Sequence, residues 1–252
     1  MTAKRFAATV SYDGTAFVGS QVQPNGRTVQ QELETAAAVL FGAPVRVELA
    51  GRTDSGVHAI GQVAAFTAET RHERATVRKA LNANLPEDVA VRAVREAPLG
   101  FDPRRWARKR WYRYTVANGE SREPLTRGTA WFVEGNLDLQ AMRAASDALL
   151  GRRDFSAFSG YLEPGRTPVR TVSRAEWSCE GSTLLFDIEA DAFLPQMVRR
   201  ITGALIRCGR GAATVEEFVR LLEQARTGSM AYVAPAHGLC LQKVWYDEGY
   251  TA

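Results

Sequence analysis

A single carboxylate, Asp54, stands in a segment whose residue types suit chemistry, AGRTDSGVHAIGQVAAF over residues 50–66. The three glycines of this segment allow positive backbone dihedrals and let another molecule come close to the backbone. Thr53 and Ser55 can donate hydrogen bonds to the carboxylate, and Arg52 can hold an anion nearby. The same residue types suit a tight turn closed by an Asx hydrogen bond, so the spacing leaves both a catalytic and a structural role open.

Two strands are predicted on either side of Asp54. Residues 45–49 alternate apolar and charged side chains, which is the period of a half-buried strand, and residues 62–68 predict a second strand. Asp54 should therefore lie in a loop that connects two strands, where a rigid scaffold can position a reactive group.

A second segment, RRWARKRWYR over residues 104–113, suits contact with a polyanion. It has six basic residues in ten, no acidic residue and three interleaved aromatic residues. The candidates for phosphate contact are Arg104, Arg108, Lys109 and Arg110, while Trp106, Trp111 or Tyr112 offers a face on which an unstacked base could lie. The alternative is a strand with a solvated charged face over a few core aromatic residues.

The segment around Asp54 resembles the active-site signature of the tRNA pseudouridine synthase A family, G-R-T-D-x-G-V-H-A followed by G-Q-V. Other segments resemble later and earlier blocks of that family in the same order and span nearly the whole chain. They are YDGT with Gly19 and Gln21, LNANLPEDVAV (81–91), RWYRY (110–114), FLPQMVRRITG (193–203) and APAHGLCL (234–241). Ser20 departs from the family, which more usually has Trp there, and we expect only local packing to differ.

The resemblance implies roles for three residues. Asp54 matches the essential aspartate, Arg199 matches the arginine that pairs with it and keeps it ionised, and Tyr112 matches the tyrosine that stacks on the target base. Without the resemblance, Arg199 would be interpreted as a solvated helical arginine, which remains the interpretation of Arg200. Tyr112 would be interpreted as a core residue with a polar tip.

Three further residues near Asp54 are expected to contact the substrate: Arg52, Thr53 and His58. For His58 the alternative is that it orients the loop. We do not expect it to act as an acid or base, because the implied isomerisation needs no group that titrates near neutral pH.

The implied reaction isomerises uridine to pseudouridine in the anticodon arm of tRNA, nominally at positions 38–40. It needs no cofactor and no metal, since one ionised carboxylate can attack the sugar or the base or remove a sugar proton. Hydrolytic glycosidases use two carboxylates, and no second one stands near Asp54, which favours isomerisation over base release. The alternative is a noncatalytic RNA-binding module. A ribonuclease is a weaker alternative, because the sequence near the basic strand has neither a histidine pair nor an acidic cluster of the kind that binds metals.

The periodicities predict an α+β fold. A polar segment near residue 100 divides the chain into an N-terminal half (1–100) with the Asp54 loop and a C-terminal half (101–252) with the basic strand and Arg199. Helices are predicted over residues 29–40, 75–84, 137–150, 195–208 with Pro195 in the first turn, and 214–222. The resemblance implies two similar halves joined through a central antiparallel sheet flanked by helices, an active-site cleft between them, and a homodimer.

The composition is that of a globular protein: 252 residues, 45% hydrophobic, 24% charged, with a net charge of +4. No apolar run approaches the ~18 residues that span a membrane, and the first residues are too polar for a secretory signal, so we expect a cytoplasmic protein. Its three cysteines, Cys179, Cys208 and Cys240, are widely spaced and suggest buried thiols, with neither a disulfide nor a zinc site.

Overall fold

The computed structural model describes residues 2–162 and 164–247, which form two compact units. The first unit holds the described residues up to Arg108 and those from Leu241 onward, and the second runs from Lys109 to Cys240. The sequence placed the division at residue 100 and assigned the C-terminal strand to the second half. That strand belongs mainly to the first unit, because it lies beside a strand of that unit's sheet.

The sheet of the first unit has the strand order β4-β1-β3-β10, with the short strand β2 also paired to β3. Its strands are β1 (Thr2–Tyr12), β2 (Glu48–Leu49), β3 (His58–Thr70), β4 (Val89–Ala97) and β10 (Leu239–Trp245). Both neighbours of β1 run antiparallel to it. A Cβ at Gly61 of β3 would lie 2.1 Å from the carbonyl oxygen of Gln242, so this close approach of β10 requires glycine.

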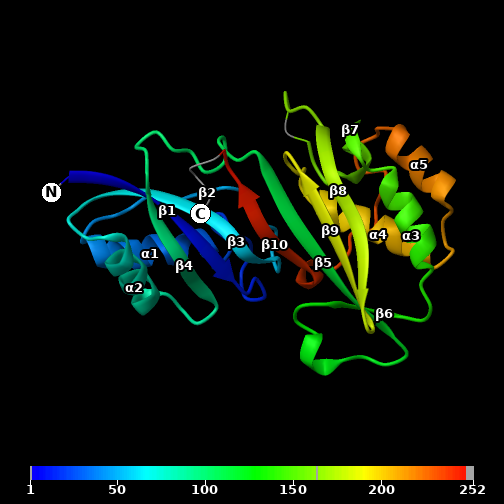
Figure 1. Cartoon of the computed structure of the whole chain (residues 1–252), viewed down its shortest axis with the longest axis horizontal. Helices are drawn as coiled ribbons and strands as arrows, with labels where there is room; N and C mark the ends of the chain where they lie inside the picture. The colour runs from blue at the N-terminus through cyan, green and yellow to red at the C-terminus, as the bar shows by residue number, and fades with distance from the viewer. Residues whose placement is uncertain (1, 163, 248–252) are drawn as a thin grey trace. The chain divides into compact units, whose positions relative to one another are not determined.

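The helices α1 (Val29–Phe41) and α2 (Arg74–Asn84) cover one face of this sheet (Figure 1). Helix α1 begins and ends as the sequence predicts: the Thr28 side chain accepts from the backbone N–H of Gln31, and Gly42 ends the helix with φ 70°. The predicted strand over residues 45–49 is wrong for residues 45–47. Side chains of α1 take the place of a partner strand there, since Gln30 donates to the carbonyl oxygen of Val47 and Glu34 accepts from its N–H.

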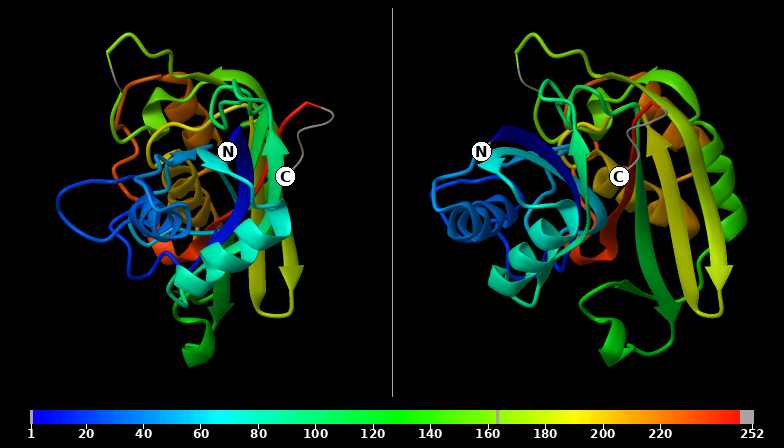
Figure 2. Two further views of the ribbon diagram at one scale, coloured as in Figure 1. Left: turned by 90° about the vertical axis from the view of Figure 1, so that its left-hand side faces the viewer. Right: turned by 60° about the vertical axis from the view of Figure 1, so that its left-hand side comes forward.

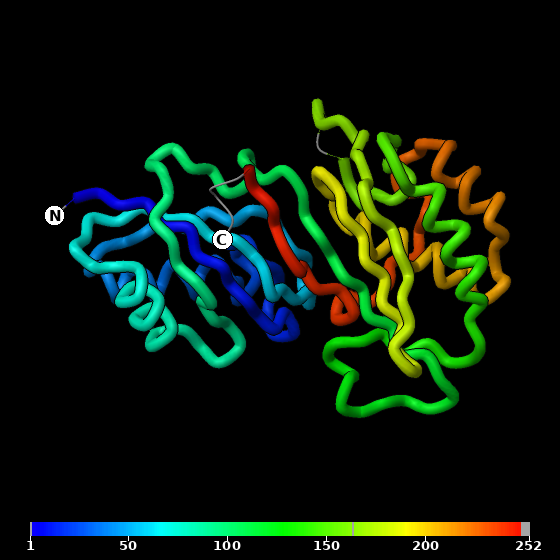
Figure 3. Tube along the Cα trace, viewed as in Figure 1, coloured from blue at the N-terminus to red at the C-terminus, as the bar shows by residue number. Residues whose placement is uncertain are grey.

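The sheet of the second unit has the strand order β5-β9-β8-β7, all antiparallel, with β6 parallel to β5. Its elements are β5 (Lys109–Gly119), β6 (Trp131–Glu134), β7 (Gly151–Asp154), β8 (Val169–Glu180), β9 (Thr183–Ala190), α3 (Leu139–Asp147), α4 (Met197–Gly209) and α5 (Val215–Glu223) (Figures 2 and 3). Short 3₁₀ turns lie at Pro124–Thr126, Ser156–Phe158 and Ala236–Gly238. The sequence predicted a loop over residues 152–168 and missed β6 and β7, whose four residues each are too short for a periodic signal.

Helices α4 and α5 show where capping rules hold and fail. Helix α5 has the predicted capping box, in which Thr214 and Glu217 bond reciprocally. Helix α4 begins at Met197, so Pro195 precedes it instead of lying in its first turn. The reason is Gln196, which has a left-handed backbone (φ 62°) and accepts a hydrogen bond from Arg200 through its side chain.

The sheet of the second unit has one apolar and one charged face. Tyr112 and Tyr114 belong to the buried face, which meets α3 where the indole N–H of Trp177 donates to Ser146. On the other face, the carboxylate of Asp187 is 3% exposed and accepts from Trp111 Nε1 at 2.7 Å and from Arg113 at 2.8 and 2.9 Å. Arg174 reaches the same carboxylate at 3.4 Å.

The predicted α+β class, with mostly antiparallel sheets flanked by helices, is confirmed. Among the cysteines, Cys208 is buried as expected. Cys179 shares the face of β8 that carries the buried Trp177, but it is exposed because it lies near the end of the strand. Within the described residues, no helix is both long enough and apolar enough to cross a membrane.

Asp187→Ala should lower the free energy of unfolding by about 3 kcal/mol, because it removes the acceptor of the partly buried Arg113 guanidinium and of the Trp111 N–H. Glu176→Ala is the matched control. Glu176 binds Arg174 at 2.9 Å from a side chain that is 67% exposed, so its loss should cost less than about 1 kcal/mol. Urea unfolding of both variants tests this, and equal losses would contradict it.

Candidate active site

Asp54 lies in the loop between β2 and β3, as the sequence predicts, and its side chain is half-buried. Its backbone forms an isolated antiparallel bridge with Gly19, which belongs to the segment after β1. The carbonyl oxygen of Asp54 accepts from the N–H of Val57 at 3.1 Å and closes a turn. The turn and the catalytic role are therefore compatible: the turn presents the carboxylate.

Ser20 holds this loop through reciprocal hydrogen bonds. Its hydroxyl accepts from the N–H of Thr53 at 2.8 Å, and its own N–H donates to the carbonyl oxygen of Thr53 at 3.1 Å. Ser20 has no solvent exposure. An indole ring cannot accept this hydrogen bond, so the Trp that is more usual in the family could not hold Thr53 in the same way.

A buried polar network supports the same loop from β1 and β3. The hydroxyl groups of Tyr12 and Thr53 lie 2.8 Å apart, and Gln62 donates to the carbonyl oxygen of Gly51 at 2.9 Å. Gln62 also donates to the Tyr12 hydroxyl at 3.4 Å. Buried polar groups that are mutually satisfied specify one conformation, so these residues restrict the backbone that leads into Asp54.

His58 joins the loop to the turn after β1. Its Nδ1 accepts from the backbone N–H of Gly14 at 3.0 Å and lies 3.1 Å from a carboxylate oxygen of Asp13. A Cβ at Gly14 would lie 2.1 Å from the carbonyl oxygen of Val57, which makes this contact possible only for glycine. Burial opposes the ionisation of nearby Asp13, but hydrogen bonds from Thr15 and the neighbouring His58 outweigh it and lower the pKa of Asp13.

The three residues near Asp54 that are expected to contact substrate differ in their exposure to solvent. Thr53 and His58 are 6% and 7% exposed and serve the loop's own hydrogen bonds. Arg52 is exposed, and it lines a small hollow together with Arg104. The predicted substrate contacts of Thr53 and His58 stay predictions, whereas Arg52 has the exposure that such a contact requires.

Tyr112 and Arg199 both lie in the second unit. The Tyr112 ring is 8% exposed and packs edge-on against Phe193, with ring centroids 5.1 Å apart. Arg199, in the first turn of α4, donates from Nε to the carbonyl oxygen of Ala234 at 2.8 Å. This contact joins two of the sequence blocks that resemble the family.

Arg200 is not the solvated arginine that the sequence suggested. Its guanidinium donates to the side chain of Gln196 and to the carbonyl oxygen of Met230. Burial, and then the charge of Arg199, lower its pKa below the usual value.

The basic residues around the start of β5 bind partners within their own units. Arg108 forms an ion pair with Asp247 at 2.6 Å, Lys109 with Glu189 at 2.7 Å, and Arg110 donates to the carbonyl oxygen of Asp191 at 2.7 Å. A cation that already has an intramolecular partner must exchange it to bind a phosphate. Their phosphate contacts stay predictions, but each would cost part of an existing interaction.

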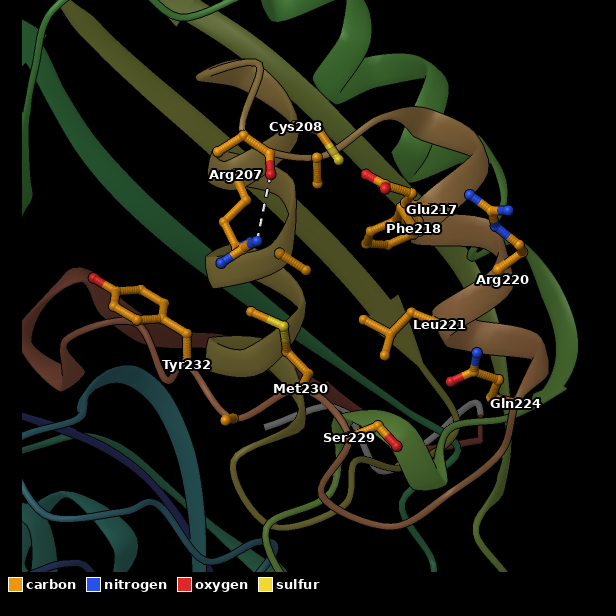
Figure 4. A pocket seen from close by; sticks show the side chains of 14 residues that line it. Arg207, Cys208, Glu217, Phe218, Arg220, Leu221, Gln224, Ser229, Met230 and Tyr232 are labelled. Atoms are coloured by element: carbon orange, nitrogen blue, oxygen red, sulfur yellow. Dashed lines mark hydrogen bonds between the residues drawn. The ribbon is translucent and has the colours of Figure 1, made fainter.

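A larger hollow of about 570 Å³ lies between α4, α5 and residues 229–232 of the second unit (Figure 4). Its charged groups are partly engaged: Arg207 donates to the carbonyl oxygen of Ala212 at 3.3 Å, and Glu217 caps α5. None of the residues that the sequence singled out for substrate contact or catalysis lines it. Among the described residues, no group of three or more His, Cys, Asp or Glu side chains is placed to hold a metal ion.

A family model described as tRNA pseudouridine synthase matches residues 8–104 and 145–247. This chain belongs to that family. The matched ranges include Asp54 and Arg199, while Tyr112 lies between them. Proteins named tRNA pseudouridine synthase A are similar over nearly their whole length: those of Citrifermentans bemidjiense (44% identical, 95% of this chain and 96% of that protein) and Myxococcus xanthus (44%, 97% and 93%).

A third relative of the same name, from Thermosipho melanesiensis, is 43% identical over 96% of this chain and 100% of that protein. Among solved structures, the crystal structure of a Cbf5-Nop10-Gar1 complex is matched with 13% identity and a TM-score of 0.32, over 79% of this chain and 54% of that one. A likeness that weak supports no inference about this fold.

Sequence reasoning missed the residues that hold the Asp54 loop. Tyr12, Ser20 and Gln62 stand inside or beside the quoted motifs, and all three are buried. What the motifs could not indicate is that all three serve one loop, because they are up to 50 residues apart.

Ser20→Ala should lower the free energy of unfolding by about 1–3 kcal/mol, since the buried N–H of Thr53 loses its acceptor. It should also lower kcat more than tRNA affinity, because Asp54 adjoins Thr53. Ser55→Ala is the control: its exposed hydroxyl donates to Phe17 at 3.1 Å, and its removal should cost at most about 1 kcal/mol. Thermal melts and turnover assays check both, and a fully stable and active Ser20→Ala would contradict the role of Ser20.

Proposed function

We propose that this protein isomerises uridine to pseudouridine in the anticodon arm of tRNA, nominally at positions 38–40, with Asp54 as the catalytic nucleophile. Membership of the tRNA pseudouridine synthase family makes the chain an isomerase that acts on tRNA. One observation carries the assignment to Asp54. It is a half-buried carboxylate whose neighbours in the loop, Thr53 and His58, are fixed by buried hydrogen bonds.

The chemistry balances without a cofactor. The bond from the sugar C1′ to the base N1 breaks, the base turns, and C1′ joins to C5 of the base. C5 loses its hydrogen as a proton and N1 gains one, so no electron or water is consumed. Asp54 can attack the sugar or the base or remove a sugar proton, and a fixed loop suits each step because no reorganisation is needed when charge moves.

Arg199 and Tyr112 complete the proposed site, as the family resemblance implies. Arg199 is assigned to pair with Asp54 and keep it ionised; its Nε–Ala234 hydrogen bond supports this by orienting the guanidinium. Tyr112 is assigned to stack on the target base, and the packing of its ring against Phe193 would hold it in a fixed plane.

The proposal includes a cytoplasmic homodimer with the anticodon arm of tRNA as its partner. The competing function is an RNA-binding module without catalysis. The partners of Arg108, Lys109 and Arg110 within the chain weaken that alternative, since a module of this kind would depend on free cations. A ribonuclease lacks support from any acidic or histidine cluster among the described residues.

Asp54→Asn should abolish pseudouridine formation while leaving folding and tRNA affinity nearly intact, because it removes the charge but keeps the size. Asp54→Glu keeps the charge and moves it by one methylene, and a displacement on the order of 1 Å can cost ~10²-fold in rate. Tritium release from 5-tritiated uridine in tRNA measures turnover, and filter binding measures affinity. Turnover by Asp54→Asn would refute the nucleophile, and parallel loss of binding would favour a structural role for the loop.

If Arg199 pairs with Asp54, the Asp54→Asn variant leaves its guanidinium without that partner. Arg199→Met in the Asp54→Asn background should then restore part of any lost stability, whereas Arg199→Met alone should destabilise. Melting curves of the four proteins in the cycle provide the test. Additive effects would show that the two residues do not interact.

Tyr112→Phe should retain turnover far better than Tyr112→Ala, because Phe keeps the aromatic face that offsets the cost of unstacking the target base, a few kcal/mol, roughly. Single-turnover tritium release compares the two variants. Equal losses would instead assign the hydroxyl to proton transfer. The Phe193 contact makes a melting curve of Tyr112→Ala a necessary control, since this ring also packs in the core.

A further inference from the structure

A small hollow of about 200 Å³ lies in the first unit beside the Asp54 loop, and we call it the arginine hollow. Its polar lining consists of Arg46, Arg52, Arg104, Glu48, Gln21 and Gln30. The sequence separates these residues by up to 83 positions. Three guanidinium groups at one small hollow repel one another, so either carboxylates within the protein or a bound anion must offset that cost.

Arg5 places Arg104 beside the other two arginines. The Arg5 side chain is 10% exposed and donates to the carbonyl oxygen of Phe101 at 2.6 Å, and it forms an ion pair with Glu48 of β2. It therefore fastens the segment after β4 to the strand that separates Arg46 from Arg52. Asp102 then turns the chain by accepting from the N–H of Arg104 at 2.9 Å.

Gln30 fastens the opposite wall. It is 3% exposed, accepts from the N–H of Val22 at 3.1 Å and donates to the carbonyl oxygen of Val47 at 3.0 Å. These bonds tie the segment that carries Gln21 to the segment that carries Arg46. Two nearly buried side chains, Arg5 and Gln30, thus fix the backbone segments on two sides of the hollow.

Three arginines and one carboxylate line the hollow, so the formal charge of its lining is positive. Glu48 is engaged by Arg5. Glu34 binds Arg46 at 3.2 Å, but it also accepts from Gln30 and from the N–H of Val47. Arg52 forms no hydrogen bond or ion pair with any residue within 2–162 or 164–247. The lining therefore keeps an excess of positive charge, and one of its arginines, Arg52, precedes the proposed nucleophile by two residues.

We propose that the arginine hollow binds one backbone phosphate of tRNA beside the target nucleotide, with Arg46, Arg52 and Arg104 sharing that phosphate. The inference rests on the proposed function for the identity of the RNA. Guanidinium groups suit this ligand because their N–H donors match phosphate oxygens bidentately. Since Arg52 precedes Asp54 by two residues, a phosphate held here would fix the strand on one side of the nucleotide that must reach Asp54.

The first test uses the salt dependence of tRNA binding by the full chain. The double variant Arg46→Gln/Arg104→Gln should lower the slope of log Kd against log salt by about one unit, because one phosphate contact is lost. Between 50 and 200 mM salt this makes the affinity change about threefold smaller than for the unaltered protein. Arg95→Gln, at an exposed site on β4 outside the hollow, is the matched control and should leave the slope unchanged.

A drop of about two units would show that the arginines bind separate phosphates, and no drop would show that the hollow binds none. Either result overturns the proposal. Melting curves of the variants show whether they remain folded. Arg46→Lys/Arg104→Lys keeps both charges and should retain the slope while losing affinity, because an ammonium group cannot form the bidentate contact.

The second test changes the RNA. Full-length tRNA is assembled with a neutral methylphosphonate at one linkage at a time near the target uridine. One such linkage should weaken binding to the unaltered protein and have no further effect on the double arginine variant. If no single linkage shows this coupling, the hollow binds a free phosphate or an acidic segment of another protein, and the proposal is wrong.

These measurements separate the inference from the proposed function. Binding slopes and linkage coupling require no turnover, whereas tritium release tests the isomerase. If tritium is released but no neutral linkage is coupled to the double arginine variant, the isomerase proposal stands and the phosphate site is rejected. If a linkage is coupled but no tritium is released, the phosphate site is supported and the isomerase proposal is rejected.

Discussion

The reciprocal hydrogen bonds between Ser20 and Thr53 are the constraint on which the candidate site depends. They join the segment after β1 to the loop after β2, and the bridge between Gly19 and Asp54 continues the same pairing by one residue. Because Ser20 is fully buried, water cannot replace these bonds without opening the unit. The position of the Asp54 carboxylate is therefore tied to the stability of the first unit's core.

The other contacts of the loop act in the same direction. The Tyr12 hydroxyl bonds to the side chain of Thr53, and Gln62 donates to the backbone of Gly51. His58 accepts from the backbone N–H of Gly14. The catalytic role proposed for Asp54 would benefit from such support, since a displacement on the order of 1 Å can cost ~10²-fold in rate. In a fixed loop, the ordering entropy is lost during folding and not during the reaction.

The distribution of positive charge explains how one chain can be both stable and able to bind a polyanion. On the outward face of the second sheet, Arg113, Arg174 and Lys109 are matched with Asp187 and Glu189, which stabilises the sheet and leaves little charge for a ligand. Around the arginine hollow, by contrast, the balance remains positive. A count of basic residues along the sequence does not distinguish these two uses.

Local sequence patterns determined much of this protein. The capping residues Thr28 and Thr214, the glycine at position 42 and the strand periodicities placed most helices and strands, because these signals depend on neighbours within a few residues. The motif around Asp54 likewise identified the loop and, with the other blocks, the family.

Tertiary structure decided what each polar side chain does. Arg108 binds Asp247, Ser20 accepts from Thr53, and Arg104 lines the same hollow as Arg46. All three relations join residues that are 33 to 139 positions apart in the sequence. Such pairings have no local signature, since they are set by strand order and by which segments the sheets bring together. The sequence by itself thus determined where the candidate carboxylate stands along the chain, and only the folded units decided which cations already have a carboxylate partner.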